Sequence, residues 1–201
     1  MIKPIIAIDI DDVLADYSAE FVLASNRLWG TKLTAKDYDE DWVKLWGVDL
    51  SEAMDRGRVL FEDQIHERLE RKEGAVEVLQ ELSERFTLKV LTARNDQSKS
   101  STLEWFTRHY PMIEHQNITF AGLWDNPDEN VAKRTKGALA KNMGVQYLID
   151  DQLKHCLAAA EHGIAALVFG DYIWNQATSL PKGVSRVNNW EAVGDYFRKL
   201  A

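Results

Sequence analysis

Short apolar runs alternate with helical patterns along most of this 201-residue sequence. The runs are Pro4–Ile8, Phe86–Thr92, Asn117–Phe120, Val145–Ile149 and Ile164–Phe169. The first is rich in β-branched residues and stops abruptly at aspartates, which is typical of a strand buried on both faces. We expect all five runs to be β-strands.

The stretches between the later runs have helical patterns, and glycine follows two of them. They are Ala75–Arg85, Ser98–His109, Lys136–Met143 and Leu153–His162. Repeated β-α-β alternation predicts an α/β fold, with a mostly parallel, Rossmann-like sheet covered by helices on both faces. Ligands bind such sheets at the carboxyl ends of the strands.

The stretch between the first two runs breaks this alternation. It is helical in pattern and carries many of the aromatic residues of the chain, namely Tyr17, Phe21, Trp29, Tyr38, Trp42, Trp46 and Phe61. We therefore predict a helical cap, residues 17–73, inserted after the first strand. Residues 1–16 and 74–201 would form the core.

Charge and cysteine content exclude several classes of protein. Lysine and arginine total 24 against 32 aspartates and glutamates, which gives a formal net charge of −8. This acidity disfavours binding to polynucleotides or anionic membranes, and no apolar run approaches the roughly 18 residues of a membrane span. Cys156 is the only cysteine. No internal disulfide can form, and we expect a cytoplasmic protein.

Two acidic pairs follow predicted strands. Asp9 and Asp11 follow the first run, and Asp150 and Asp151 follow the fourth. Either pair alone is compatible with a solvated acidic turn. Because strand ends of a parallel sheet meet at one edge, two such pairs predict a site for a hard cation, and oxygen ligands without histidine or thiolate favour Mg²⁺.

Two further residues suit an anion at the same edge. Thr92 ends the second run, and a strand-end hydroxyl before a helix can bind an anion. Lys136 opens the helical stretch that leads to Asp150 and Asp151. Taken singly, the threonine is explained by β-propensity and the lysine by a solvated surface charge. Their order along the chain is what makes them informative.

The order Asp-x-Asp, threonine, lysine, Asp-Asp resembles the four motifs of the haloacid dehalogenase superfamily, here spread over residues 9 to 151. The opening Asp-Ile-Asp-Asp-Val-Leu-Ala-Asp-Tyr, residues 9–17, resembles the 5′(3′)-deoxyribonucleotidases and their bacterial relatives, which usually show Asp-x-Asp-Gly-Val-Leu-Ala-Asp-Phe. Residues 169–175 also resemble the bacterial members. The resemblance implies a Mg²⁺-dependent phosphomonoesterase whose substrate is a nucleoside monophosphate.

Roles for single residues follow from this resemblance. Asp9 would attack phosphorus and form an aspartyl-phosphate, and Asp11 would protonate the leaving alkoxide and then activate water. Asp9, the Asp11 backbone carbonyl and one or both of Asp150 and Asp151 would hold Mg²⁺, with Asp151 slightly favoured. Thr92 and Lys136 would hold the phosphoryl oxygens.

The sequence differs from the family pattern at two positions near the motifs, and the cap offers three aromatic residues that could contact a nucleobase. Asp12 stands where the family often has glycine, and Arg94, two residues after the motif threonine, could contact phosphate or substrate. Tyr17 occupies the position where the family stacks an aromatic ring on the nucleobase. Trp42 and Trp46 lie four residues apart and could share a helical face toward the base. Each ring could equally belong to the cap core.

Other functions stay open at this level. The same chemistry could serve a sugar phosphate, whereas a polynucleotide end is disfavoured by the net charge of −8. Asp11 disfavours a dehalogenase, because carbon–halogen displacement has no alkoxide to protonate. A non-catalytic phospho-acceptor or nucleotide-binding module would share the acids, threonine and lysine but lack a cap. The oligomeric state is not determined by these patterns.

Overall fold

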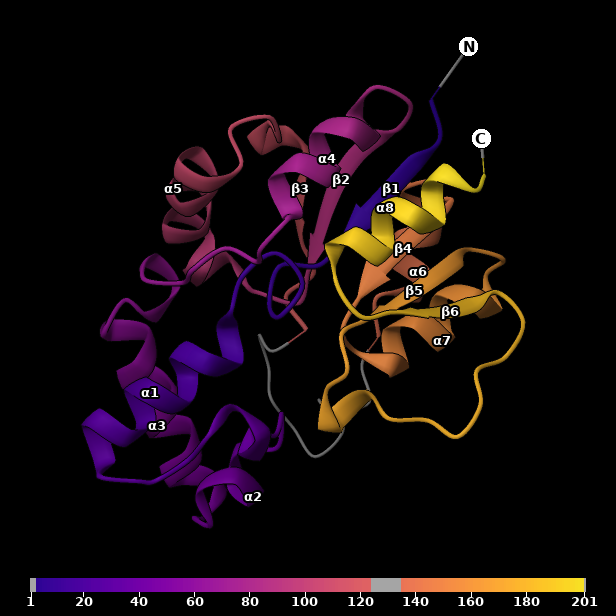
Figure 1. Cartoon of the computed structure of the whole chain (residues 1–201). Coiled ribbons are helices and arrows are strands. Elements are labelled where there is room, and N and C mark those ends of the chain that lie inside the picture. Colours follow the sequence, from indigo (N-terminus) through magenta and orange to yellow (C-terminus); the bar gives the residue numbers. More distant parts are fainter. Residues whose placement is uncertain (1–2, 124–134, 201) are drawn as a thin grey trace.

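A computed structural model describes residues 3–123 and 135–200 (Figure 1). Its centre is a six-stranded, fully parallel sheet with the order β3-β2-β1-β4-β5-β6. The strands are β1 Ile5–Ile8, β2 Thr87–Thr92, β3 Ile118–Phe120, β4 Tyr147–Asp150, β5 Ala165–Phe169 and β6 Val184–Val187. The α/β fold with a Rossmann-like parallel sheet is therefore confirmed.

The helices cover both faces of this sheet and fill the segment between β1 and β2. They are α1 Tyr17–Trp29, α2 Trp42–Trp46, α3 Leu50–Glu62, α4 Ala75–Ser83, α5 Lys99–His109, α6 Gly137–Asn142, α7 Leu153–Glu161 and α8 Trp190–Arg198. Short 3₁₀ turns lie between several of them, including one at Ile65–Glu67. None of the described helices is long and apolar enough to cross a bilayer.

Strand β1 holds the central position because it pairs on both sides. Ile8 lies opposite Val90 of β2 and Ile149 of β4. The strand order reverses direction between β1 and β4, and such a switch point opens a crevice at the carboxyl ends of the strands. The residues that follow β1 and β4 therefore line that crevice.

Alternate side chains of β1 pack into two separate apolar cores, one on each face of the sheet. Ile6 and Ile8 belong to a large apolar cluster on the side of α4, α5 and α8, whereas Ala7 belongs to a second cluster with α6 and α7. All three side chains are fully buried. This two-sided burial is why the run lacks polar alternation.

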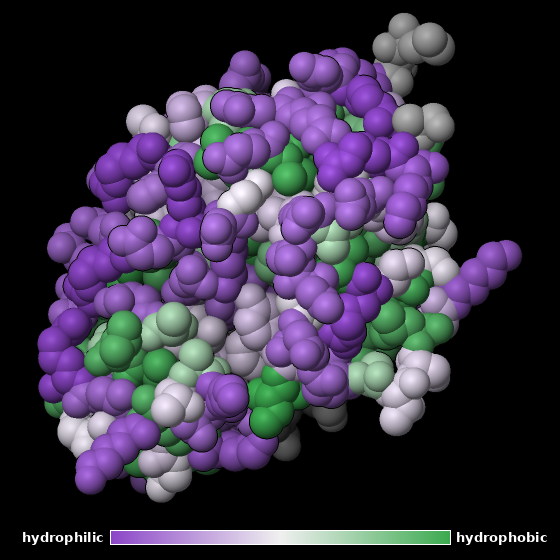
Figure 2. Space-filling view, in the orientation of Figure 1, coloured by the Kyte–Doolittle hydropathy of each residue, from purple (hydrophilic) through white to green (hydrophobic). Residues whose placement is uncertain are grey.

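Residues 17–73, which we call the cap segment, pack around their own aromatic cluster. Phe21, Tyr38, Leu60 and Ile65 are buried there, with several tryptophans packed against them. In Figure 1 the helices α1, α2 and α3 lie to one side of the sheet, and Figure 2 shows apolar patches over that part and over other parts of the same, mostly hydrophilic face. Most of the exposed large apolar side chains among the described residues belong to this segment.

The chain passes between core and cap segment twice, and the two passages are hydrogen-bonded to each other. Asp16 N donates to Glu70 O and Lys72 N donates to Leu14 O, both at 2.8 Å. Ala15 and Arg71 form an isolated antiparallel bridge. The cap segment is thus joined to the core through one paired two-strand connection.

Candidate active site

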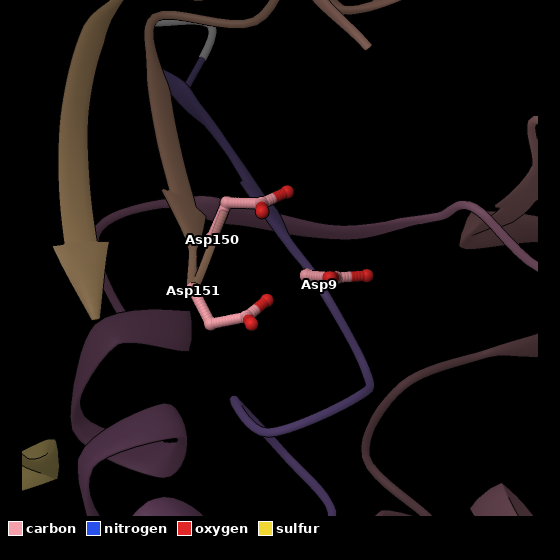
Figure 3. Close-up of side chains that lie close together, drawn as sticks. All are labelled: Asp9, Asp150 and Asp151. Atoms are coloured by element: carbon pink, nitrogen blue, oxygen red, sulfur yellow. The ribbon is translucent and has the colours of Figure 1, made fainter. Parts of the chain in front are cut away.

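Three carboxylates converge at the switch point of the sheet. Asp9 follows β1, Asp150 ends β4 and Asp151 comes next, and each offers an oxygen within 4.8 Å of the others. Figure 3 shows the three side chains directed to the same side of β1 and β4. The backbone holds them there, since Asp9 N donates to Ile149 O at 2.9 Å. Sequence predicted this convergence from the two acidic pairs.

Lys136 lies within this cluster. Its Nζ is 2.7 Å from Asp9 Oδ1 and 2.9 Å from Asp150 Oδ2, and its side chain is fully buried. Burial opposes the charged form of the lysine, but Asp150 and Asp9 outweigh it and raise the Lys136 pKa. The ammonium at this position is therefore charged and fixed between two carboxylates.

One ammonium does not balance the carboxylates around it. Burial raises the pKa of Asp9 to about 7, with Lys136 opposing the shift and Asp150 and Asp11 adding to it. Burial also raises the pKa values of Asp150 and Asp151, and the Asp150 charge adds to the shift of Asp151. The cluster therefore has an excess of negative charge that a cation would relieve.

Individual oxygens show where a cation fits. Asp9 Oδ1 is buried and makes no well-directed hydrogen bond among the described residues, although Lys136 Nζ is close. Both oxygens of Asp150 are engaged, by Lys136 and by Gln152 N. Asp151 accepts from Trp174 Nε1 and Gln152 Nε2 through Oδ2, and its Oδ1 has no such bond within the described part of the chain. These oxygen donors suit a hard divalent cation.

Thr92 lies at the same edge of the sheet. It ends β2 two residues past the pairing of Val90 with Ile8, and it is fully buried. Its Oγ1 accepts from Arg94 N at 3.2 Å, which leaves the hydroxyl proton free to donate. The geometry is compatible with the predicted anion contact.

Arg94 contacts Asp11. Its Nε and Nη2 donate to Asp11 Oδ2 and Oδ1 at 3.1 and 2.5 Å, and Nη1 donates to Thr102 Oγ1 at 2.9 Å. Burial would raise the pKa of Asp11, but the guanidinium overcomes it and holds that pKa below its ordinary value. Sequence gave no sign of this pair, because its members are 83 residues apart.

Asp12 is not part of the carboxylate cluster and binds the start of α1 instead. Its backbone is left-handed, with φ at 57°, where the family often has glycine. Its side chain accepts from Ser18 N and Ser18 Oγ and so caps the start of α1, and Lys72 Nζ lies 3.8 Å away. Burial raises the pKa of Asp12 to about 7 despite Lys72 and Ser18.

Tyr17 and the two tryptophans occupy different surroundings. The Tyr17 ring contacts Phe21, Tyr38 and His66, and besides burial the Asp11 charge raises its pKa, so its hydroxyl lies near that carboxylate. Trp42 and Trp46 both pack on Phe21 inside the cap segment. The structure thus brings Tyr17 to the site and places the two tryptophans in the cap core.

Two residues at the site were not singled out from sequence. His66 stacks on Tyr17 with ring centroids 6.0 Å apart, and burial lowers its pKa to about 3. It borders a cavity of about 200 Å³ together with Phe61, Gln97 and Ser100. Isolated histidines carry no ligand spacing, so no sequence signal could find this one.

Trp174 is the second site residue that was not singled out from the sequence. Its Nε1 donates to Asp151 Oδ2 at 2.6 Å, and its ring stacks on Tyr172, with centroids 4.5 Å apart. The signal for this residue was present, because residues 169–175 resemble the bacterial members of the nucleotidase family. The structure shows that this segment supports Asp151.

Solved structures share this fold. A haloacid dehalogenase-like hydrolase from Streptococcus pneumoniae aligns with a TM-score of 0.68, 18% identity and 98% coverage of both chains. A haloacid dehalogenase-family hydrolase from Deinococcus radiodurans, solved with bound phosphate and sodium, aligns with a TM-score of 0.64 and 13% identity, covering 98% of this chain and 96% of that one. At these identities the likeness establishes the fold.

Sequence comparison is more specific. The chain is 26% identical over 194 residues to the 5′(3′)-deoxyribonucleotidase of Bacillus subtilis, which covers 95% of this chain and 96% of that protein. The family model described as 5′ nucleotidase, deoxy (pyrimidine), cytosolic type C protein matches residues 3–127, well over half of the chain. With the carboxylate cluster at the strand ends, these matches show that the chain belongs to this 5′ nucleotidase family of phosphoric monoester hydrolases.

Proposed function

We propose that this protein is a Mg²⁺-dependent phosphatase of (deoxy)nucleoside monophosphates that works through an aspartyl-phosphate at Asp9. The observation that carries the proposal is the convergence of Asp9, Asp150 and Asp151 around Lys136 at the switch point of the sheet. Phosphoryl transfer requires mainly positioning and neutralisation of charge, and this cluster offers both. Membership of the nucleotidase family supports the choice of substrate.

The first step would use Asp9 and Asp11. A carboxylate oxygen of Asp9 attacks phosphorus, the bond from phosphorus to the ester oxygen breaks, and Asp11 gives its proton to the leaving alkoxide. In the second step Asp11 takes a proton from water while the water oxygen attacks phosphorus. The bond from phosphorus to Asp9 then breaks, and phosphate leaves with Asp9 again a carboxylate and Asp11 again protonated.

The other residues hold the phosphoryl group. Lys136 would neutralise one phosphoryl oxygen with its fixed ammonium, and the Thr92 hydroxyl would donate to another. Asp9, the Asp11 backbone carbonyl and Asp151 would hold Mg²⁺, with Asp150 fixed as the partner of Lys136. The cation would supply charge stabilisation for the transferring phosphoryl group.

The cap segment would provide the nucleoside contacts. Tyr17 lies beside Asp11, and the cavity next to His66 opens between the cap segment and the region of α5. A nucleobase presents a flat π-face to such rings. We propose Tyr17 as the stacking residue, and Trp42 and Trp46 as residues that shape the cap around it.

A substrate panel tests the proposal. Purified protein is assayed for phosphate release from 5′- and 3′-nucleoside monophosphates, in ribo and deoxy forms, and from sugar phosphates. Each assay is run with Mg²⁺ and with EDTA. We expect nucleotide turnover with Mg²⁺, loss of turnover in EDTA, and recovery when Mg²⁺ is restored in excess. Turnover of sugar phosphates alone would contradict the substrate assignment, and full activity in EDTA would contradict the metal assignment.

A further inference from the structure

The Arg94 side chain is held from both ends. At one end Nε and Nη2 donate to the two oxygens of Asp11, and at the other Nη1 donates to Thr102 Oγ1. Thr102 belongs to α5 and is fully buried, and only 4% of the Arg94 side chain is exposed. A planar guanidinium bound in this forked manner fixes the plane of its carboxylate as well as its position.

This arrangement leaves Arg94 poorly placed to bind phosphate. Lys136 Nζ contacts Asp9, whereas the ion pair of Arg94 within the described residues is made with Asp11. Three of the five guanidinium N–H groups are used by Asp11 and Thr102. A phosphoryl oxygen would therefore have to come to the two remaining N–H groups, on Nη1 and Nη2, while the guanidinium stays bound to Asp11 and Thr102.

We propose that Arg94 is a positioning residue that orients the Asp11 carboxyl toward the leaving-group oxygen, an inference that rests on the proposed phosphatase activity. The Asp11 side chain is 27% exposed, so it remains accessible to a substrate although both of its oxygens accept from Arg94. The Thr102 hydroxyl accepts from the guanidinium and holds it in place, so Thr102 acts on Asp11 through Arg94.

Arg94 donates to both oxygens of Asp11 and so stabilises the carboxylate that remains after Asp11 has given its proton to the leaving group. Nη2 donates to Oδ1 at 2.5 Å, and Nε donates to Oδ2 at 3.1 Å. The proton passes from Asp11 to the ester oxygen as its bond to phosphorus breaks, and returns from water in the second step.

The test separates proton delivery from phosphate binding. Phenyl phosphate and 4-nitrophenyl phosphate have the same shape around phosphorus and lack a nucleobase, but nitrophenolate leaves without a proton far more readily than phenolate. Arg94→Lys keeps the positive charge and loses the fork, and Thr102→Val removes the anchoring hydroxyl. Each variant is assayed on both esters and for inhibition by inorganic phosphate, after its thermal unfolding shows that it is folded.

We expect Arg94→Lys to lower kcat/KM for phenyl phosphate by at least about tenfold more than for 4-nitrophenyl phosphate, because general acid catalysis contributes roughly 10²- to 10⁴-fold. Inhibition by phosphate should be unchanged. Thr102→Val should show the same preference to a smaller degree. Arg58→Lys, a change in an exposed arginine that pairs with Asp55, should leave both esters unaffected.

A double variant completes the test. Asp11→Asn should show the same leaving-group preference, and adding Arg94→Lys to it should cost little more, because the arginine would act only through Asp11. Equal losses on both esters with weaker inhibition by phosphate would overturn the inference and make Arg94 a phosphate ligand. A wild-type protein without phosphatase activity would overturn the proposed function, and this inference with it.

Discussion

At the scale of single residues, charge dominates the site. Three carboxylates are buried together in the part of the chain that the structure describes, and the ammonium of Lys136 pairs with two of them, Asp9 and Asp150. Buried like charges are destabilising unless something neutralises them. Removing one carboxylate should therefore affect catalysis and stability in opposite directions.

Asp9→Asn tests this opposition. An amide attacks phosphorus poorly, so we expect less than about a hundredth of wild-type turnover, in line with the size of single chemical contributions. The variant should unfold in EDTA at a temperature at least as high as the wild type, because one buried charge is gone. Turnover assays and thermal melts measure the two effects. Retention of substantial activity would exclude Asp9 as the nucleophile.

Asp12 gives stability a dependence on pH. Burial raises its pKa to about 7 in the folded protein, from an ordinary value of 3.8. Below pH 3.8 the Asp12 carboxyl is protonated in both the folded and the unfolded protein. Between the two values the unfolded chain has lost a proton that the folded chain keeps, so the contribution of Asp12 to stability falls as pH rises, by up to about 1.4 kcal/mol per pH unit, and levels off above pH 7.

Asp12→Asn removes this titration and keeps a residue that tolerates a left-handed backbone. The free energy of unfolding of the wild type minus that of the variant should fall steadily between pH 4.5 and 7. Urea unfolding in EDTA at several pH values measures it. A difference that stays constant with pH would show that Asp12 is ionised throughout and stabilised by Ser18 and Lys72.

At the scale of elements, the packing of α6 on α7 positions Lys136. A Cβ added at Gly137, the first residue of α6, would lie 2.7 Å from the carbonyl carbon and oxygen of Ala158 in α7. Backbone atoms inside a helix cannot yield as a flexible side chain can. The close approach of the two helices therefore depends on glycine at this position.

We expect Gly137→Ala to destabilise the protein by about 1–3 kcal/mol, the usual cost of overpacking. Gly194→Ala is the matched control, since the atoms nearest to its Cβ would be those of the flexible guanidinium end of Arg198 in α8. Alanine there should be neutral or stabilising, because it favours the helix. Urea unfolding of both variants gives the comparison. Similar stabilities would mean that α6 can shift away from α7 at little cost.

The sequence predicted the elements whose apolar patterns are strong and missed those whose patterns are short. Strand β6 was not predicted, because its four residues include the polar Ser185 and Arg186. Helix α8 was also missed, although Trp190, Val193 and Phe197 are buried at helical spacing and could have revealed it. Predicted boundaries differ from those observed by one or two residues, as for β4, predicted over Val145–Ile149.

The candidate site was predictable to the extent that strand ends fix it. Asp9, Asp150 and Asp151 follow strands, and a parallel sheet brings strand ends together regardless of the side chains around them. The pairing of Arg94 with Asp11 depends on the path of a loop and on Thr102 in another helix. Such contacts are set by tertiary packing, which no local pattern records.

At the scale of the whole molecule, two of the contacts between the cap segment and the core lead toward Asp151. Lys154 of α7 pairs with Glu40 at 2.5 Å, and the Tyr38 ring lies edge-on to Trp174 with centroids 5.2 Å apart. Trp174 in turn donates to Asp151. The position of the cap segment is therefore linked through a few side chains to a carboxylate of the proposed metal site.

Substrate choice should depend on Tyr17, the aromatic residue of the cap segment that lies near Asp11. Stacking of a base on an aromatic ring is worth roughly 1–3 kcal/mol, so Tyr17→Ala should lower kcat/KM for nucleoside monophosphates by about 5- to 150-fold. The loss on 4-nitrophenyl phosphate should be much smaller, and Tyr17→Phe, which keeps the ring, should approach the wild type on both. Steady-state kinetics on the two substrates decide the matter. Equal losses would assign the ring to cap packing alone.

The central place of β1 also bears on how the protein is made. Ile8 pairs with Val90 and with Ile149. Strand β1, which Asp9 follows, can therefore pair only after residues much later in the sequence have been translated. Contacts this distant in sequence form late and slow the search for the native state. Asp9 is thus translated with the first strand of the sheet, and its carboxylate neighbours Asp150 and Asp151 are translated much later. We therefore expect a nascent chain that ends before β4, and so lacks Asp150 and Asp151, to have none of the proposed phosphatase activity.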